Sequence, residues 1–302
     1  MKAVVLKSFG DVDALAVQDM PEPEFGPGDV KVRVTAAGIN PVDSKIRRGE
    51  MQELMPVTFP TILGRDVSGE VMEVGANVKG FQPGDRVMGM VHGGYAEVVV
   101  APANVWAKVP HSLELRDAAA LPMVTLTGAQ LIEEQVKPAR GDTVLITGAL
   151  GAVGRAAIHA AHALGVKVWA GVRAQQAEQA RRELNMEGVV AIDRPEEVAK
   201  LPTLDAVADT VGGKAVTPVL DKVKRGGKVC SVVGEPVGAK ERGLVGSFFL
   251  SHPDGPRLAR LAESVAKGEL LIPIAQTFPL DAAKEAQKHA ETAGTGKVLL
   301  VN

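Results

Sequence analysis

A glycine-rich segment, Gly148–Gly154, most constrains what this chain can fold into. It follows Thr143–Thr147, which reads as a strand, and leads into the helical stretch Ala152–Leu164. A second strand, Lys167–Val172, closes the unit within about 30 residues, the length of a dinucleotide-binding βαβ unit. Glycines let the backbone approach a pyrophosphate, whose charge then lies at the helix N-terminus. The alternative is a tight turn without a ligand, but the agreement of strand, turn, helix and strand favours a nucleotide.

The end of the second predicted strand indicates which nucleotide is bound. An NAD site usually carries Asp or Glu there to hold the ribose hydroxyls. This chain has Arg173 instead and no acid before Glu178, and Arg194 ends the third predicted strand. A guanidinium pairs with a 2′-phosphate that an acid would repel. The pattern predicts NADPH; the alternative for Arg173 is a solvated loop charge.

Two styles of sequence divide the 302 residues, a length typical of about two domains. Residues 1–112 contain short alternating strands broken by Gly and Pro, which predict a mostly antiparallel β domain. In residues 113–270, strands alternate with alanine-rich helices, which predicts a doubly wound parallel sheet of the Rossmann type and an α/β fold overall. Residues 271–302 revert to the first style, so we expect them to return to the first domain.

Strand and helix bounds follow from the same patterns. Besides the elements above, we expect strands at Lys2–Lys7, Val30–Ala36, Val67–Val74, Ala96–Val100, Gly188–Ile192, Ala206–Asp209, Lys228–Val233, Leu244–Leu250 and Lys297–Val301. We expect helices at Gln175–Leu184, Gly213–Val223, Pro256–Lys267 and Asp281–Glu291.

Composition excludes several functions. The net charge of −2 gives no electrostatic basis for binding nucleic acid or anionic membranes. A single cysteine, Cys230, excludes an internal disulfide and a multi-cysteine zinc site. The N-terminal apolar stretch is too short for a signal peptide, and no uncharged apolar run is long enough to span a bilayer. We therefore expect a reduced, soluble, cytoplasmic protein.

Other catalytic signatures are missing from the sequence. It contains no phosphate loop with GK[ST], no G-x-S-x-G, no H-E-x-x-H and no C-x-x-C. His159 and His162 share a helix face, but no carboxylate or thiol is spaced to complete a metal site with them. Hydride transfer needs none of these groups, because a nicotinamide carries the chemistry and the protein supplies geometry.

The combination of domains resembles the medium-chain dehydrogenase/reductases, and short strings agree along nearly the whole chain. They are Gly38-Ile39-Asn40-Pro41-Val42-Asp43, Gly64-Arg65-Asp66-Val67-Ser68-Gly69, Gly84-Asp85-Arg86-Val87, Gly93-Gly94-Tyr95-Ala96-Glu97, Ala119-Ala120-Leu121-Pro122, the glycine loop and Gly296-Lys297-Val298. Zinc-dependent members carry a Cys near Asn40 and a His-Glu pair near Arg65. This chain has neither, and so it resembles the zinc-independent quinone oxidoreductase branch, the zeta-crystallin-like enzymes.

This resemblance implies a GroES-like domain (1–112, completed by 271–302), a Rossmann domain (113–270), NADPH in the cleft between them and a homodimer. Thr127 matches the threonine on the nicotinamide side, and Lys297 matches a lysine near the phosphates. Further matches to cofactor-binding positions are Gly151, Ala152 and Val153 at the pyrophosphate, Val233 and Gly234 over the nicotinamide ribose, and Phe248, Phe249 and Leu250 at the carboxamide. The alternative for the two phenylalanines is core or interface packing.

The resemblance also implies catalytic residues. Asn40 matches the active-site asparagine of the branch, whose amide would hold a substrate carbonyl or orient a water, and Asp43 follows at the usual spacing. The alternative for Asn40 is a capped turn, since Asn-Pro is a turn signal. Two tyrosines usual in the branch are replaced by Lys45 and Met51. Because Tyr95 is the only tyrosine in the chain, no quinone-stacking platform is evident. Another tyrosine usual in the branch, near the adenosine phosphate, is replaced by Arg194.

The leading hypothesis is an NADPH-dependent reductase that transfers hydride to a quinone or another conjugated carbonyl, an enone or alkenal, without a metal. Quinones and enones are both electron-poor acceptors of hydride, so the sequence does not distinguish between these two substrate classes. Two alternatives are a catalytically quiet NADPH-binding protein with a structural or redox-sensing role, and an enoyl-thioester reductase.

Overall fold

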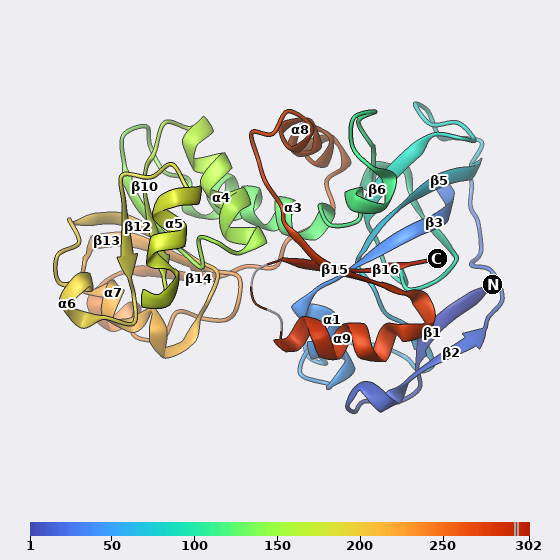
Figure 1. Cartoon of the computed structure of the whole chain (residues 1–302), viewed down its shortest axis with the longest axis horizontal. Coiled ribbons are helices and arrows are strands. Elements are labelled where there is room, and N and C mark those ends of the chain that lie inside the picture. The colour runs from blue at the N-terminus through green and yellow to red at the C-terminus, as the bar shows by residue number, and fades with distance from the viewer. Residues whose placement is uncertain (293, 295) are drawn as a thin grey trace. The chain divides into compact units, whose positions relative to one another are not determined.

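The computed structural model describes residues 1–292, 294 and 296–302, and the chain divides into two compact units. The first unit consists of Met1–Met123 and Pro253–Asn302, and the second of Val124–His252. Figure 1 shows the mixed β architecture of the first unit and the helices that flank the sheet of the second.

The first unit is built on a large, mostly antiparallel sheet and a smaller one. The large sheet has the order β15-β16-β3-β5-β6-β8, with β7 also paired to β3, and the small sheet has the order β2-β1-β4. Strand β3 alternates inward and outward, so that Val30, Val32 and Val34 enter the core. Strand β16 pairs antiparallel with β3, and the C-terminal segment thereby completes this sheet.

The strands of this unit have the following bounds: β1 (Lys2–Leu6), β2 (Leu15–Asp19), β3 (Asp29–Ile39), β4 (Thr61–Ile62), β5 (Asp66–Val74), β6 (Arg86–Met90), β7 (Val98–Pro102), β8 (Trp106–Lys108), β15 (Ile274–Pro279) and β16 (Lys297–Val301). Its helices are α1 (Pro41–Arg47), α2 (Leu115–Ala118), α8 (Gly255–Ala266) and α9 (Ala283–Thr292). Helix α9 lies beside α1 and against β16 (Figure 1).

The second unit is a parallel sheet with the order β11-β10-β9-β12-β13-β14. Numbered from β9, this is the order 3-2-1-4-5-6 of dinucleotide-binding domains, in which the connections reverse direction between β9 and β12. The predicted α/β fold class, a Rossmann-type sheet with a mostly antiparallel β domain, is confirmed. Ligands of such sheets bind at the carboxyl ends of the strands, next to the reversal point.

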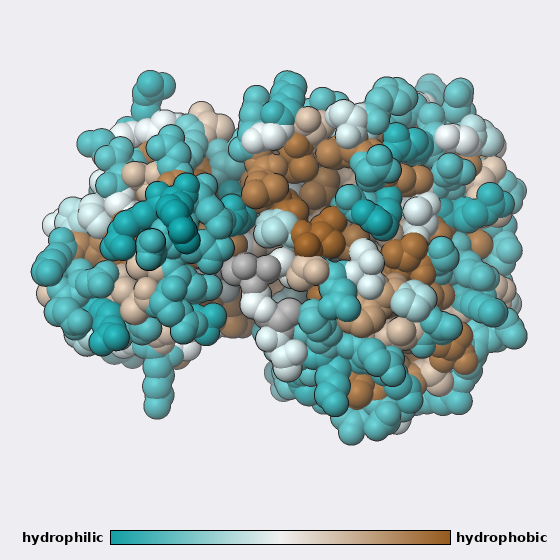
Figure 2. Space-filling model, in the orientation of Figure 1, coloured by the Kyte–Doolittle hydropathy of each residue, from teal (hydrophilic) through white to brown (hydrophobic). Residues whose placement is uncertain are grey.

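The strands of the second unit are β9 (Thr143–Thr147), β10 (Lys167–Val172), β11 (Gly188–Ala191), β12 (Leu204–Asp209), β13 (Val223–Ser231) and β14 (Val245–Phe248). Its helices are α4 (Ala152–Ala163), α5 (Ala177–Glu183), α6 (Pro195–Val198) and α7 (Thr217–Leu220), and the division between the units falls within α3 (Pro122–Gln130). Helix α5 buries Ala177 and Ala180, and hydrophilic side chains cover the face of α5 and α6 seen in Figure 2.

The unit boundaries and one helix differ from the sequence-based expectation. The first boundary lies after Met123 rather than at 112, and the second lies before Pro253 rather than at 270. Helix α8 goes with the first unit because it packs on β8; a side chain at Gly255 would lie 2.3 Å from the backbone oxygen of Trp106.

The helix predicted over Gly213–Val223 is also shorter. Gly212 and Gly213 adopt positive φ angles of 72° and 68°, a left-handed conformation that does not continue into an α-helix. Helix α7 therefore begins only at Thr217, with a proline in its first turn, and the chain enters β13 at Val223.

Within the part of the chain that the structure describes, none of the helices combines the length and apolar character required to cross a lipid bilayer.

Candidate functional site

The glycine loop of the second unit joins β9 to α4. Gly148 has a φ of 61°, which favours glycine, and a Cβ there would lie 2.4 Å from the hydroxyl of Thr210. At Gly154 a Cβ would lie 2.3 Å from the backbone oxygen of Gly148. These two glycines are therefore required by the packing of the loop itself. The loop forms as the sequence predicts, between a strand and a helix.

Gly151, the middle glycine of the loop, differs from Gly148 and Gly154 because the packing around it does not require a glycine. Its φ is −72°, and a Cβ would meet only the backbone oxygen of Gly148, at 3.1 Å. Gly151 is the N-cap of α4, which has no side-chain cap and no acidic residue in its first turn. The first N–H groups of this helix are thus left to an external acceptor, and the helix dipole favours an anion there. These features fit the pyrophosphate of a dinucleotide.

A hydrogen-bond network fixes the strand ends beside this loop. Asp209, at the end of β12, accepts from the hydroxyls of Thr147 and Ser231, each over 2.7 Å. It also accepts from the backbone N–H groups of Val211 and Gly212, each at 3.0 Å. The ends of β9, β12 and β13 are therefore joined by one buried carboxylate, which sequence reasoning did not single out.

Most residues that the resemblance assigns to the cofactor lie at this edge of the sheet. The backbone N–H of Val233 donates to the hydroxyl of Ser231 over 3.2 Å. The backbone N–H of Phe249 donates to the backbone oxygen of Ser231 over 2.9 Å. Thr127 donates to the hydroxyl of Ser251 over 2.7 Å and so lies beside the segment that follows β14. Gly234 has open space where a Cβ would stand, Phe248 is half-buried and Leu250 is exposed.

Two exposed arginines follow neighbouring strands at the same edge. Arg173 comes directly after β10, and Arg194 comes shortly after β11. Nε of Arg173 donates to Gln176 over 3.4 Å. Asp193, an acid that sequence reasoning missed, directly precedes Arg194 in the chain. It accepts a hydrogen bond from the backbone N–H of Ala174, the residue after Arg173, over 2.8 Å. The 2′-phosphate contact of Arg173 and Arg194 stays a prediction, and Asp193 adds a negative charge beside the turn that follows Arg173.

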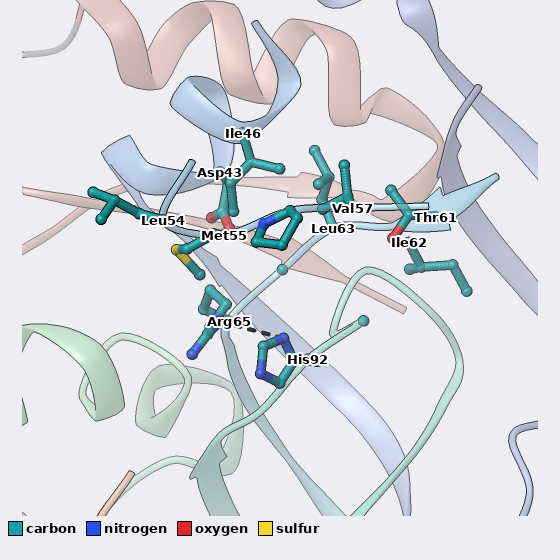
Figure 3. A pocket seen from close by; sticks show the side chains of 13 residues that line it. Asp43, Ile46, Leu54, Met55, Val57, Thr61, Ile62, Leu63, Arg65 and His92 are labelled. Atoms are coloured by element: carbon teal, nitrogen blue, oxygen red, sulfur yellow. Dashed lines mark hydrogen bonds between the residues drawn. The ribbon is translucent and has the colours of Figure 1, made fainter. Parts of the chain in front are cut away.

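The first unit contains a cavity of about 310 Å³ (Figure 3). Its walls are mostly apolar and come from α1, the turn after it, β4 and the segments around residues 64 and 92. The lining residues are Asp43, Ile46, Leu54, Met55, Pro56, Val57, Thr61, Ile62, Leu63, Gly64, Arg65, His92 and Gly93. An apolar cavity with a few polar groups is the usual form of a small-molecule site.

Asp43 belongs to this wall, but its carboxylate is fully buried. Oδ2 accepts from the backbone N–H of Asn40 over 2.8 Å and from the hydroxyl of Tyr95 over 2.8 Å. Oδ1 has no hydrogen-bond partner. Burial raises the pKa of Asp43 to about 6, against the lowering effects of Asn40 and Tyr95. The same burial, with Asp43 nearby, raises the pKa of Tyr95 well above its ordinary value.

Arg65 and His92 lie on another side of the cavity and contact one another (Figure 3). Nη1 of Arg65 lies 3.2 Å from Nδ1 of His92, while Nε of Arg65 has no partner. Burial lowers the pKa of Arg65. Burial and then the charge of Arg65 lower the pKa of His92, so a neutral His92 accepts the hydrogen bond. Sequence reasoning named Arg65 only for the metal ligand that it replaces.

A second network holds Asn40 behind this wall. Lys297 donates to Oδ1 of Asn40 over 2.6 Å, to Oδ2 of Asp66 over 3.1 Å and to the backbone oxygen of Ile39 over 3.0 Å. The amide nitrogen of Asn40 donates to the same Asp66 oxygen over 2.9 Å, and Asp66 also accepts from the backbone N–H of Met123. All three side chains are buried.

This network bears on two residues assigned from sequence. Asn40 is 2% exposed and its amide is engaged at both ends, so it presents no free polar atom to the cavity. Lys297 uses all three of its donors inside the first unit. The phosphate contact of Lys297 and the direct catalytic contact of Asn40 stay predictions, and the structure gives both residues a structural role.

Comparison with known proteins identifies the family. Residues 26–111 match the model of the alcohol dehydrogenase GroES-like domain, and residues 184–300 match that of the zinc-binding dehydrogenases. The human mitochondrial NAD(P)H oxidoreductase RTN4IP1 is 33% identical over 95% of this chain and 85% of that protein. Among the described residues, no group of three His, Cys, Asp or Glu side chains is placed to hold a metal ion.

Solved structures agree with this assignment. The quinone oxidoreductase from Coxiella burnetii has a TM-score of 0.88 and 30% identity, over 100% of this chain and 99% of that one. The Escherichia coli quinone oxidoreductase, solved in complex with NADPH, has a TM-score of 0.86 and 25% identity over 100% of both chains.

Proposed function

Because this chain belongs to the medium-chain dehydrogenase/reductase family, in its quinone oxidoreductase branch, we propose that it transfers hydride from NADPH to a quinone or another conjugated carbonyl without a metal ion. The second unit binds the cofactor and the cavity of the first unit binds the acceptor. The predicted homodimer and cytoplasmic location remain predictions.

The observation that carries the cofactor assignment is the uncapped N-terminus of α4 at Gly151. It lies at the carboxyl end of β9, beside the reversal point of the sheet. The N–H groups of this first turn would hold the pyrophosphate. Arg173 and Arg194 would hold the 2′-phosphate, which favours NADPH over NADH. Thr127, Val233, Gly234 and Phe248–Leu250 would border the nicotinamide half.

A bound nicotinamide would supply the hydride, and the protein's part is to bind and orient the acceptor and to keep water out. The apolar walls of the cavity, such as Ile46, Val57 and Leu63, serve the last purpose. We assign Asn40 and Asp43 to positioning: the Asn40 N–H fixes Asp43 at the start of α1, and Lys297 fixes the Asn40 amide. Thr61, Arg65 and His92 are the polar lining residues outside these networks, and Arg65 is the one that carries a charge.

One observation favours small enones and alkenals over aromatic quinones. Tyr95, the only tyrosine in the sequence, is fully buried and hydrogen-bonded to Asp43, so its ring cannot stack on the ring of a bound quinone. Among the described lining residues, the imidazole of His92 is the one aromatic ring. A quinone would therefore bind without a stacking partner, whereas an enone does not require one.

The experiment is NADPH oxidation by the purified protein with a panel of quinones, enones, alkenals and an enoyl thioester, in the presence of a strong chelator. We expect turnover of a conjugated ketone or aldehyde. Tight NADPH binding with no turnover of any acceptor would favour the catalytically quiet protein. Turnover of the thioester alone would favour an enoyl-thioester reductase.

A further inference from the structure

Arg65 is a cation at the cavity without a direct counter-ion. It is 8% exposed, and its Nε has no hydrogen-bond partner. In the part of the chain that the structure describes, no carboxylate oxygen lies within ion-pair distance of its guanidinium. A buried charge is costly unless it is paired, so this arrangement calls for a negatively charged or strongly polar partner.

Neither of the two nearby carboxylates forms an ion pair with Arg65 in the part of the chain that the structure describes. Oδ2 of Asp66 receives Lys297 and Asn40, and its Oδ1 receives the Met123 N–H. Oδ2 of Asp43 accepts from Asn40 and Tyr95, and Oδ1 of Asp43 is buried without a hydrogen-bond partner, so it does not contact the Arg65 guanidinium. Both carboxylates act on Arg65 only through space. A ligand oxygen in the cavity would be the direct partner that the guanidinium lacks.

The orientation of Arg65 is set by His92. Nδ1 of His92 accepts a hydrogen bond from Nη1 of the guanidinium, and Nε of Arg65 has no partner. Figure 3 shows the two side chains on the same side of the cavity, with Asp43 on another. Preorganised donors in an apolar setting stabilise a developing negative charge far better than water does, because they need no reorganisation.

We propose that Arg65, oriented by His92, binds the carbonyl oxygen of the acceptor and stabilises the oxyanion that forms on it. The proposal deepens the proposed function and rests on it. Hydride from the reduced nicotinamide adds to the β-carbon of an enone, the former double-bond pair joins the α-carbon to the carbonyl carbon, and the carbonyl pair moves onto oxygen. The enolate's carbon–carbon double-bond pair then takes a proton from solvent at the α-carbon, the pair on oxygen re-forms the carbonyl, and the cofactor is left oxidised.

The first test compares acceptors whose oxyanions differ in basicity. Reduction of methyl vinyl ketone produces a strongly basic enolate, whereas benzoquinone produces a weakly basic one that needs less stabilisation. We expect Arg65→Met to lower kcat for the ketone by about a hundredfold to a thousandfold, the range found on removing one oxyanion donor. The loss with benzoquinone should be smaller by about tenfold, with KM changed only a few-fold.

Two further variants separate this role from a structural one. Arg65→Lys keeps the positive charge and should recover at least about tenfold of the lost kcat with the ketone. Arg116→Met removes an exposed arginine of the same unit, paired with Asp117, and should leave both acceptors unaffected. Equal losses for ketone and quinone in Arg65→Met, or a change in KM alone, would overturn the proposal.

A binding measurement without cofactor keeps the proposal testable whatever the activity. The probe is para-nitrophenolate, a planar conjugated oxyanion whose visible absorbance shifts when its oxygen is hydrogen-bonded. We expect a shift with the parent protein and with Arg65→Lys, and none with Arg65→Met. A parent that binds the probe but reduces no acceptor would contradict the proposed function and leave the oxyanion site standing. A parent that reduces the ketone but binds the probe no better than Arg65→Met would contradict the oxyanion site alone.

Discussion

The hydroxyl of Tyr95 donates to Oδ2 of Asp43 over 2.8 Å, inside a core where both side chains are fully buried. The other oxygen of Asp43 has no partner. Only one of the two carboxylate oxygens therefore accepts hydrogen bonds, and burial disfavours the ionised form of the group. The raised pKa of Asp43, about 6, expresses this cost.

The first prediction is that Asp43→Asn stabilises the protein near neutral pH. A carboxyl whose pKa rises from 3.8 in the unfolded chain to about 6 in the folded one favours folding below the lower value. That favourable contribution is lost as the pH rises through about 6. The amide cannot ionise, and its oxygen can still accept from Tyr95 and Asn40. We expect the stability of the variant relative to the parent to rise by up to about 3 kcal/mol between pH 4 and pH 8, less at any one pH because the new amide NH2 has no acceptor at the Oδ1 position.

Urea unfolding from about pH 4 to pH 8 measures this difference. The gap between variant and parent should close as the pH falls through the window between the two pKa values. Tyr95→Phe removes a hydrogen bond that lowers the pKa of Asp43, so it should move the window upwards. A variant whose stability relative to the parent is independent of pH would show that Asp43 does not titrate as described.

The second prediction concerns the buried pair of Lys297 and Asp66. Lys297→Met leaves the buried Asp66 carboxylate without its ion-pair partner and Oδ1 of Asn40 without its donor. Breaking a buried ion pair from one side typically costs about 3–5 kcal/mol, and we expect a loss of that size in urea unfolding. The double variant with Asp66→Asn should recover part of it. A loss of NADPH affinity at unchanged stability would instead place Lys297 at the phosphates.

The third prediction separates charge from bulk at Gly151. Asp is a favourable N-cap residue, and the φ of −72° at Gly151 is one that residues with a side chain adopt. Its Cβ would lie 3.1 Å from the backbone oxygen of Gly148, which requires only a small shift, so Gly151→Asp should fold. Its carboxylate would repel the pyrophosphate, and we expect NADPH affinity to fall by at least about tenfold more than in the matched Gly151→Asn. Fluorescence titration measures the affinities, with circular dichroism as the folding control. Parental affinity in a folded Gly151→Asp would place the pyrophosphate elsewhere.

The fourth prediction tests the nucleotide preference. Arg173→Ala should weaken NADPH binding by about tenfold to a hundredfold and leave NADH binding unchanged, because a charge-assisted contact contributes about 1.5–3 kcal/mol. Asp193→Asn removes the opposing acid between the two arginines and should strengthen NADPH binding. Equal affinities of the parent for the two cofactors would remove Arg173 from this role.

The sequence predicted the parts that local pattern determines. The strand, turn and helix around Gly151 carry their own signals of glycine, apolar run and alanine-rich helix, and the structure places them accordingly. The compact units divide after Met123 and before Pro253, limits that local pattern does not predict, because α8 belongs with the first unit through its packing against β8. The contacts of Lys297 with Asn40 and of Tyr95 with Asp43 join residues distant in sequence, and only the fold brings them together. Arg65 was visible in its motif, but its lack of a counter-ion is a three-dimensional property.

Isotope transfer follows the proposed hydride from NADPH to a conjugated carbonyl. The protein is given methyl vinyl ketone and NADPH that carries deuterium at the transferable position of its nicotinamide, and the product is examined by mass spectrometry. We expect saturated ketone with one deuterium on the former β-carbon, formed in step with NADPH consumption and unaffected by a chelator. NADPH consumed without deuterium in the ketone, or no ketone reduced by a protein that binds NADPH, would contradict the proposed hydride transfer.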